Sequence, residues 1–145
     1  MRDRTAKQLS TLHTLVYRAT RGRIGRRLVD NDMLLLTTTG RTSGRKHTVP
    51  LLYLDAGSSL IVIASWGGRP KHPHWYQNLI ANPAVQVRLP DRRFRAVART
   101  AEPEERHRWW PKIVDAYDGY ATYQSRTDRE IPVVFLEDTT TRRID

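Results

Sequence analysis

The sequence contains no cysteine, no long apolar run and comparatively few acidic residues. The absence of cysteine excludes disulfides, thiolate metal ligands, iron–sulfur clusters and a cysteine nucleophile. No apolar stretch approaches the roughly 18 residues that a membrane-spanning helix needs. The basic start is not followed by the apolar segment of a signal peptide, so we expect a cytoplasmic protein. The 145 residues, of which 39% are hydrophobic and 28% charged, are typical of one globular domain.

The shortage of acidic residues leaves the chain strongly basic. Lys and Arg number 25 against 15 Asp and Glu, which gives a net charge of +10. Such a chain attracts polyanions, including nucleic acid, anionic lipid and phosphorylated ligands. Nucleic-acid binding would need exposed aromatic and basic residues interleaved on one sheet face. The aromatic residues instead cluster in segments without regular alternation, which argues against that function.

Much of the excess charge lies at the N-terminus. Residues 1–30 contain eight basic and two acidic side chains. Leucines and a valine recur there at helical spacing, which predicts an amphipathic helix over about residues 6–20. This helix could lie on an anionic membrane surface, or it could pack its apolar stripe on the domain and leave its basic face in solvent. We therefore divide the chain into a basic N-terminal extension, residues 1–30, and a barrel domain, residues 31–145.

From residue 33 onward the sequence changes to short β-like runs separated by turns. The predicted strands are Met33–Thr39, Thr48–Leu54, Leu60–Ser65, Val85–Leu89, Phe94–Ala101 and Ile131–Leu136. Short turns follow the first and second of these runs. Because parallel neighbours need long crossovers, the short turns predict that the first three strands form an antiparallel meander.

Two helical segments are predicted within the barrel domain. The first is His74–Ala81, and the second begins at Pro103, a residue type that suits the first turn of a helix. Pro111 is expected to kink or split the second helix. About six strands and two to four helices favour a mainly β protein, a small antiparallel barrel with helices at its rim.

No familiar catalytic motif is present. Only His72 and His74 are close together among the histidines, and no carboxylate joins them at the spacing of metal ligands. We therefore expect no metal site. Phosphate-binding loops, dinucleotide-binding glycine motifs and the hydrolase nucleophile elbow are also missing from the sequence.

Three segments could nevertheless carry chemistry. Gly40–Lys46 combines glycines, hydroxyls and basic residues, which suits either an anion-binding nest or a basic turn in solvent. Ala64–Gly68 could let a flat ring approach the backbone, or could simply end a strand. Tyr117, Tyr120 and Tyr123 would share one helix face, which could contact an aromatic substrate or a developing oxyanion, or serve for packing.

Together, and in this order, several runs resemble the deazaflavin-dependent nitroreductase family of actinobacteria. The resemblance covers about residues 10–137. It rests on Leu34–Gly44, Val49–Leu54, Ala64–Gly68, Pro70–Leu79, Ala81–Pro83, Tyr117–Arg129 and Ile131–Val134.

The resemblance implies an α+β fold of the FMN-binding split-barrel type, about six mostly antiparallel strands with peripheral helices. It implies coenzyme F420, a deazaflavin with a phospholactate and polyglutamate tail, and hydride transfer from the reduced cofactor to a quinone, a nitroaromatic or another activated unsaturated acceptor. A non-catalytic F420- or FMN-binding carrier of the same fold is the alternative. A homodimer is also expected, because split barrels of the wider superfamily often dimerise. A quinone acceptor would suit an enzyme at the inner surface of the cell membrane.

The resemblance also implies the residues of the site. Ser65 would lie near the acceptor, and the substrate side would be shaped by Tyr117, Tyr120 and Tyr123. The residues implied to bind the cofactor are Arg41, Thr42, Ser43, Arg45, His47, Val49, Pro50, Leu51, Leu52, Ile63, Ala64, Ser65, Trp66, Gly67, Lys71, His74, Trp75, Tyr76, Asn78 and Tyr120.

Three of these positions depart from the family pattern. Many relatives have basic residues where Thr42 and His47 stand, and a lysine where Trp66 stands. We expect weaker contacts to the cofactor's phosphate or tail, which Arg45 and Lys46 could offset. Trp66 is expected to narrow the acceptor pocket.

Overall fold

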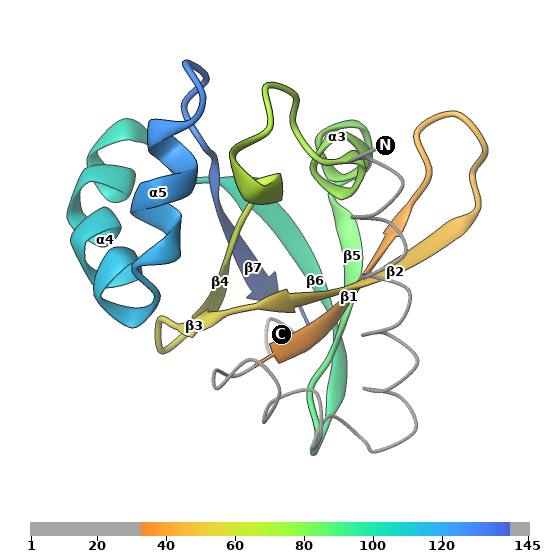
Figure 1. Cartoon of the computed structure of the whole chain (residues 1–145). Helices are drawn as coiled ribbons and strands as arrows, with labels where there is room; N and C mark the ends of the chain where they lie inside the picture. Colours follow the sequence, from red (N-terminus) through yellow and green to blue (C-terminus); the bar gives the residue numbers. More distant parts are fainter. Residues whose placement is uncertain (1–32, 140–145) are drawn as a thin grey trace.

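The computed structural model describes residues 33–139, and within them one antiparallel sheet dominates (Figure 1). Its strand order is β2-β1-β5-β6-β7-β4-β3. The strands are β1 (Met33–Thr39), β2 (Lys46–Leu52), β3 (Leu54–Asp55), β4 (Ser59–Ile63), β5 (Ala84–Arg88), β6 (Arg93–Thr100) and β7 (Val133–Asp138). The helices are α3 (His74–Ala81), α4 (Pro103–Ala116) and α5 (Gly119–Ser125), with a short 3-10 turn, η1 (Trp66–Gly68). The helix predicted over about residues 6–20 lies outside the described residues.

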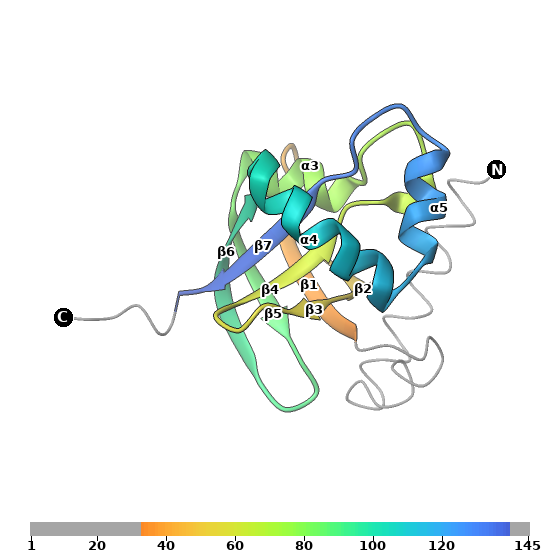
Figure 2. The same cartoon turned by 90° about the vertical axis from the view of Figure 1, so that its left-hand side faces the viewer.

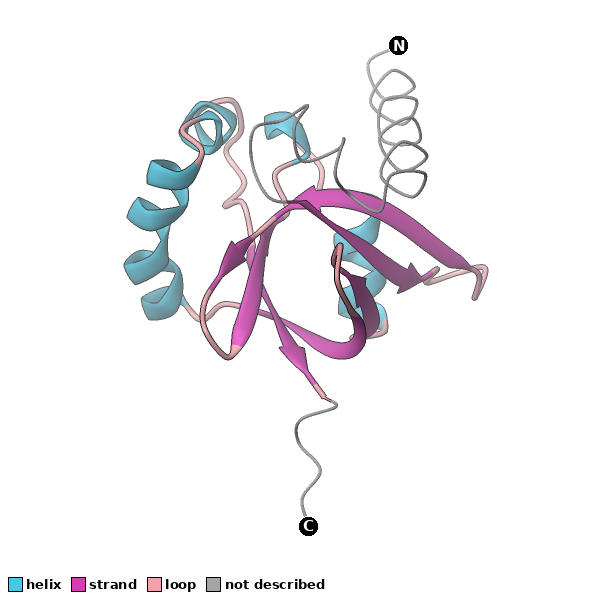
Figure 3. Ribbon diagram, turned by 90° about the horizontal axis from the view of Figure 1, so that it is seen from below, coloured by secondary structure: helices cyan, strands magenta, loops and turns pink. Residues whose placement is uncertain are grey.

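The sheet curls into an open barrel, which Figure 3 shows from below. β2 and β3 stand at the two ends of the strand order, yet only Tyr53 separates them in the sequence. The two edges of the sheet therefore come together at Tyr53. This arrangement confirms the predicted antiparallel barrel with helices at its rim.

Alternating side chains fill the barrel interior. Along β1, Leu34 and Leu36 are fully buried in the main core, whereas Leu35 packs in a separate cluster on the outer face. Helix α3 packs on this core through Trp75 and Leu79. Burial of these side chains fixes the angle at which the first turn of α3 meets the sheet.

A second core lies outside the barrel, where α4 and α5 pack over β4 and β7 (Figure 2). Ile61 and Phe135 point from the strands into this core, and they meet Ile113 of α4 and Tyr120 of α5. α4 begins with a reciprocal capping interaction between Glu102 and Glu105, as expected for a helix with acidic residues in its first turn.

The pairing of the predicted three-strand meander is confirmed. β1 pairs antiparallel with β2, and β3, which continues the same predicted strand after Tyr53, pairs antiparallel with β4. The predicted strand Thr48–Leu54 is interrupted at Tyr53, so the described residues contain seven strands instead of about six. Short turns therefore identified the antiparallel neighbours, but they did not show that the middle strand breaks at Tyr53, where the two ends of the strand order meet.

Pro111 does not split α4, which runs from Pro103 to Ala116 without a break. Proline removes the hydrogen bond to the carbonyl of His107, and that residue is exposed, so water can replace the lost donor. The ends of the other predicted elements differ by one or two residues. β4 ends at Ile63, which leaves Ala64 and Ser65 outside the strand.

Candidate functional site

The predicted site residues come from four segments along one rim of the barrel. These are the β1–β2 hairpin, the turn η1 with its flanks, α3 and α5 (Figure 1). The hairpin, α3 and the η1 turn make direct side-chain contacts with one another, and η1 packs on α5. The structure therefore gathers residues that are up to about 80 positions apart in the sequence.

Asn78 joins the hairpin to α3. Its buried side-chain oxygen accepts hydrogen bonds from the backbone nitrogen of Arg41 at 3.1 Å and from the Arg41 guanidinium at 2.8 Å. Its amide nitrogen donates to the Thr38 hydroxyl at 3.2 Å. The Arg41 guanidinium also lies 3.4 Å from Nδ1 of His74. Asn78 thus fixes the base of the hairpin that was predicted to hold the anionic tail.

The tip of that hairpin is compact and exposed. The backbone nitrogen of Gly40 donates to the carbonyl of Arg45 at 2.7 Å, and Ser43 accepts from the backbone nitrogen of Arg45 at 3.1 Å. A side chain at position 40 would meet Ser43 and His47, which accounts for the glycine there. Thr42 is exposed, as are the two basic residues that follow Gly44.

The Ser65–Gly68 segment forms a left-handed turn. Trp66 has a φ of +45°, and Gly67 and Gly68 continue in the same region at +65° and +81°. Few non-glycine residues adopt this conformation, and such strain concentrates at functional sites. The Trp66 ring lies 5.6 Å from the His74 ring, and the Arg69 guanidinium stacks 4.9 Å from it.

The Arg129 side chain stabilises this turn through hydrogen bonds to backbone carbonyls on both sides of it. Its guanidinium donates to the backbone carbonyls of Ala64, Ser65 and Arg69 at 3.2, 2.7 and 2.9 Å. The same group donates to Nδ1 of His72 at 2.9 Å. A half-buried guanidinium bonded to three carbonyls fixes the path of the chain on both sides of Trp66.

Gln124 fixes Arg129 in turn. Its amide donates to the Arg129 carbonyl at 2.8 Å, and its oxygen accepts from the backbone of Ile131 at 2.9 Å and from Arg106 at 3.0 Å. Neither Gln124 nor Arg129 was predicted as a site residue, because both act through backbone groups and their partners are remote in the sequence. Both residues lie in Tyr117–Arg129, one of the runs that carry the family resemblance. This was the signal in the sequence that could have identified them as site residues.

Gly68 is the point at which η1 meets α5. A side chain there would collide with the backbone oxygen of Tyr123 and would lie 3.0 Å from Cβ of Arg126. This close approach brings the turn against the helix that carries two of the three predicted tyrosines.

The three tyrosines form one cluster, although they do not lie on one helix. Tyr117 caps the end of α4, and Tyr120 and Tyr123 belong to α5. Ring centroids are 5.1 to 6.4 Å apart, and the hydroxyls of Tyr117 and Tyr123 are 3.4 Å apart. The hydrogen bond to Tyr117, and then burial, raise the pKa of Tyr123 to about 12.

Tyr120 and Ser65 both carry hydroxyls with unused hydrogen-bonding capacity. Within the described residues neither hydroxyl has a hydrogen-bond partner, although the two side chains are only 5% and 8% exposed. Neither oxygen is among the fully buried unpaired atoms, so each reaches an accessible surface. Burial raises the pKa of Tyr120, which keeps its phenol protonated and able to donate.

Some predicted cofactor residues lie in the cores. Trp75 and Tyr76 pack in the barrel interior, and the Tyr76 hydroxyl bonds to Thr100 at 2.8 Å. Ile63 belongs to the second core beneath α4 and α5. These buried side chains hold the segments of the rim in place through their packing in the cores.

The predicted β2 residues divide between two faces. Val49 and Leu51 pack with the barrel core, on the same face as His47, whereas Pro50 and Leu52 alternate to the outer face. Since β2 is an edge strand, a ligand at this edge could reach Pro50 and Leu52 through their backbone.

The rim is positively charged. Arg45, Lys46 and Lys71 are exposed, and none forms an ion pair within the described residues. Residues 33–139 contain no cluster of three or more potential metal ligands. No helix in that range is long and apolar enough to cross a membrane.

Comparisons with known proteins agree with the resemblance. A profile of the F420H(2)-dependent quinone reductase family matches residues 9–138. An F420H(2)-dependent quinone reductase of Mycobacterium tuberculosis is 42% identical over 134 residues, which cover 89% of each chain.

Solved structures place the fold in the same group. An F420-H2 dependent reductase, FDR-A, is 47% identical with a TM-score of 0.67, over 73% of this chain and 94% of its own. A structure described as a domain-swapped dimer is 40% identical with a TM-score of 0.69, over 94% of this chain and 96% of its own. The fold is therefore a split β-barrel. The chain belongs to the F420H2-dependent quinone reductase family and is an oxidoreductase whose cofactor is coenzyme F420.

Proposed function

We propose that the protein reduces a quinone, with nitroaromatics and other activated unsaturated compounds as further acceptors. Support for a quinone comes from the family description and from the name of the 42% identical mycobacterial relative. Family membership favours F420 over FMN, and an enzyme over the non-catalytic carrier that the sequence left open.

The residues of the rim fit the cofactor. Gly67 has open space where a side chain would stand, so a flat ring can approach the backbone there. Arg45, Lys46 and Lys71 supply exposed positive charge for phosphate and carboxylates, and Arg41 is preorganised by Asn78. The reduced cofactor, when bound, supplies the hydride. The protein's task is then to orient the two reactants and exclude water.

The unpaired hydroxyls of Ser65 and Tyr120 carry the proposal about catalysis. Each hydroxyl has an accessible oxygen and no partner within the described residues, so it is free to donate a hydrogen bond to a bound ligand. We assign to Tyr120 donation to the acceptor oxygen as negative charge develops there. Ser65 donates nearer to the reacting centre, and Tyr117 and Tyr123 shape the wall of the substrate side.

Removal of single hydroxyls tests these roles. Tyr120→Phe and Ser65→Ala should each lower kcat by about 100-fold, the usual effect of losing one oxyanion donor. Their matched controls, Tyr53→Phe and Ser59→Ala, should leave kcat within about twofold. Unchanged kcat in both site variants would contradict the assignment. Fluorescence titration with oxidised F420 and, in parallel, FMN tests the cofactor site separately, and binding of FMN alone would remove the tail-binding roles.

The place of action is a further part of the proposal. We assign the barrel domain, residues 31–145, to the cytoplasm, with residues 1–30 holding it at anionic lipid where a quinone dissolves. Deleting residues 1–30 should reduce sedimentation with anionic liposomes, and undiminished binding would contradict this role. A homodimer is supported by the relative described as a domain-swapped dimer, and sedimentation equilibrium measures it directly.

A further inference from the structure

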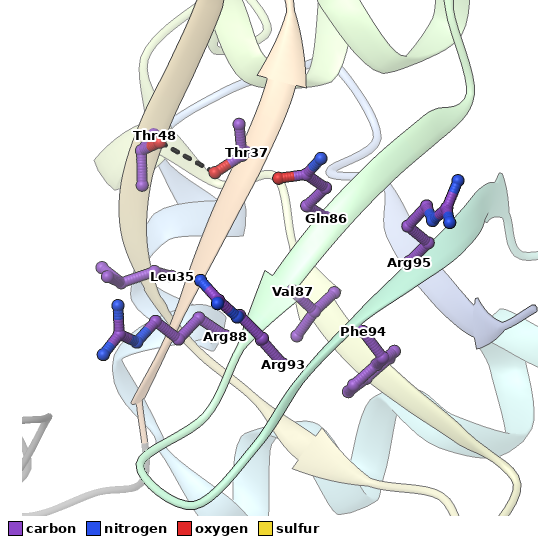
Figure 4. Close-up of a pocket in the computed structure, with 9 residues that line it drawn as sticks. All are labelled: Leu35, Thr37, Thr48, Gln86, Val87, Arg88, Arg93, Phe94 and Arg95. Carbon is purple, nitrogen blue, oxygen red and sulfur yellow. Dashed lines mark hydrogen bonds between the residues drawn. The ribbon is translucent and has the colours of Figure 1, made fainter. Parts of the chain in front are cut away.

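A hollow of about 600 Å³ lies on the outer face of β2, β1, β5 and β6 (Figure 4). A hollow of this volume is within the range of small-molecule sites. It is lined by Leu35, Thr37, Thr48, Gln86, Val87, Arg88, Arg93, Phe94 and Arg95. Among the described helices, α4 and α5 cover β4 and β7, while α3 packs on the barrel core. The hollow is therefore separate from the rim that carries the proposed cofactor site.

Three arginines line this hollow. Arg88 and Arg93 are opposite each other in the register of β5 and β6, and Figure 4 shows their side chains next to Leu35. Arg95 lies two residues further along β6, opposite Gln86. None of the three forms an ion pair with any described residue. Like charges directly opposite on neighbouring strands destabilise a sheet.

Two nearby arginines, Arg92 and Arg99, differ from these three because each contacts a carboxylate. Arg99 bonds to Glu105 at 2.8 Å and to Glu137 at 3.0 Å. Arg92 lies 3.6 Å from Asp138. Carboxylates of α4 and β7 thus pair with Arg99, and a carboxylate of β7 pairs with Arg92. The fold leaves unneutralised charge where the sheet surface is hollowed.

Polar groups extend the charged part of the hollow. The hydroxyls of Thr37 and Thr48 bond to each other at 2.8 Å, and Gln86 follows in the same row across the sheet. Leu35, which is only 2% exposed, lies beside the guanidinium pair. Guanidinium groups bind phosphate and carboxylate oxygens in a two-pronged geometry, and hydroxyls and amides complete such contacts.

We propose that this hollow binds a free small molecule that carries at least two phosphate or carboxylate groups. A ligand with more than one negative charge is needed to balance three cationic side chains. A recess also fits a compact ligand better than it fits the planar surface of a membrane. Residues 1–30 are an unsuitable occupant because their own net charge is +6. None of the residues that line the hollow is among those assigned to the cofactor, although Thr37 and Thr48 belong to the two strands of the hairpin proposed to hold its tail.

Calorimetric titration of the full-length protein with inorganic pyrophosphate at low ionic strength tests the proposal. The Arg88→Gln/Arg93→Gln variant should bind pyrophosphate at least about tenfold more weakly than the unaltered protein. Arg108→Gln, on the exposed face of α4, should bind as the unaltered protein does. Arg45→Gln/Lys46→Gln, in the hairpin, should do so when the cofactor site is saturated with F420. Without pyrophosphate, Arg88→Gln/Arg93→Gln should melt at the same or a higher temperature, because the repulsion between the two arginines is removed.

Three results would overturn the proposal. The first is equal loss of affinity in the hairpin variant, and the second is displacement of pyrophosphate by F420, since either would assign the anion to the cofactor site. The third is binding to phosphatidylglycerol vesicles without binding to free pyrophosphate, which would make the face a lipid surface. None of these measurements depends on turnover, so they remain decisive if the acceptor proposed above is wrong.

Discussion

Nη1 of Arg129 lies 2.9 Å from Nδ1 of His72, and this contact defines the protonation state of the histidine. Because arginine can only donate, Nδ1 has to be the acceptor, and the ring proton is on Nε2. Burial, and then the charge of Arg129, lower the pKa of His72 below its ordinary value of 6.5. His72 is therefore neutral in the folded protein at neutral pH.

A pH dependence of stability follows from this neutral histidine. The unfolded chain takes up a proton at His72 at a higher pH than the folded protein does, so acid favours unfolding. The contribution of neutral His72 to the free energy of unfolding is fully present above about pH 6.5. It is lost as the pH falls toward the lower pKa that His72 has in the folded protein. Thermal melts between pH 7.5 and 5 should show a larger fall in Tm for the unaltered protein than for His72→Asn. Asparagine keeps an acceptor but does not titrate, and parallel curves would contradict this role of His72.

Replacement of Arg129 by lysine should destabilise the protein and weaken F420 binding. A single ammonium cannot replace a planar group that reaches Ala64, Ser65 and Arg69 at once. Loss of charge-assisted hydrogen bonds to buried carbonyls costs about 2 kcal/mol of unfolding free energy. Guanidinium chloride melts and F420 titrations measure both effects. Arg126→Lys is the control, since the one hydrogen bond that its side chain forms in the described part is a 3.4 Å contact to the Gly67 carbonyl. Equal effects would argue against a special role of Arg129.

The two adjacent glycines of the left-handed turn should respond differently to alanine. Both have positive φ, so each alanine variant carries the backbone strain of that conformation, about 1 kcal/mol. Gly68→Ala also drives a methyl group into the backbone of Tyr123, whereas position 67 is open. Only Gly68→Ala should therefore move α5, which near-ultraviolet circular dichroism of the tyrosine cluster would detect. Matching spectra and matching Tm values for both variants would show that α5 does not depend on this contact.

Asn78→Ala should loosen the hairpin at its base. The substitution removes the acceptor for the backbone and guanidinium of Arg41 and the donor to Thr38, all at a site that is 4% exposed. We expect a loss of about 2 kcal/mol in unfolding free energy and weaker F420 binding. Asn82→Ala, at the exposed end of the same helix, is the matched control. Full F420 affinity in Asn78→Ala would show that the hairpin does not need this support.

The sequence predicted individual elements better than their arrangement. Local patterns predicted β1 and α3 with the bounds that the structure has, because apolar runs and turn residues act within a few positions. The same patterns could not show that β4 pairs with β7, since the paired residues are 70 to 78 positions apart in the sequence. The prediction that Pro111 would split α4 was wrong because Pro111 is exposed. Water can replace the hydrogen bond that a proline removes on an exposed helix face, but not on a buried one.

For the candidate site, the sequence predicted which segments come together but not which of their side chains face the site. The family resemblance pointed to Ser65 and to the hairpin, and the fold brings these segments to one rim. It could not distinguish side chains that face the rim from those that fill a core, which is why Trp75 and Ile63 were included. Arg129 was missed because a guanidinium that binds backbone carbonyls leaves no pattern of complementary charges in the sequence.

The position of β7 in the sheet has a consequence for biosynthesis. β7 is the described strand that hydrogen-bonds to both β6 and β4, so it joins the four-stranded part β2-β1-β5-β6 to the hairpin β3-β4. It is also the last strand in sequence among the described residues. While the ribosome is still translating, the two parts have no sheet partner in common, and contacts between distant segments form slowly. The turn after β4 and the hairpin after β1 belong to different parts, so the nascent chain can complete the cofactor rim only once Asp138 has emerged.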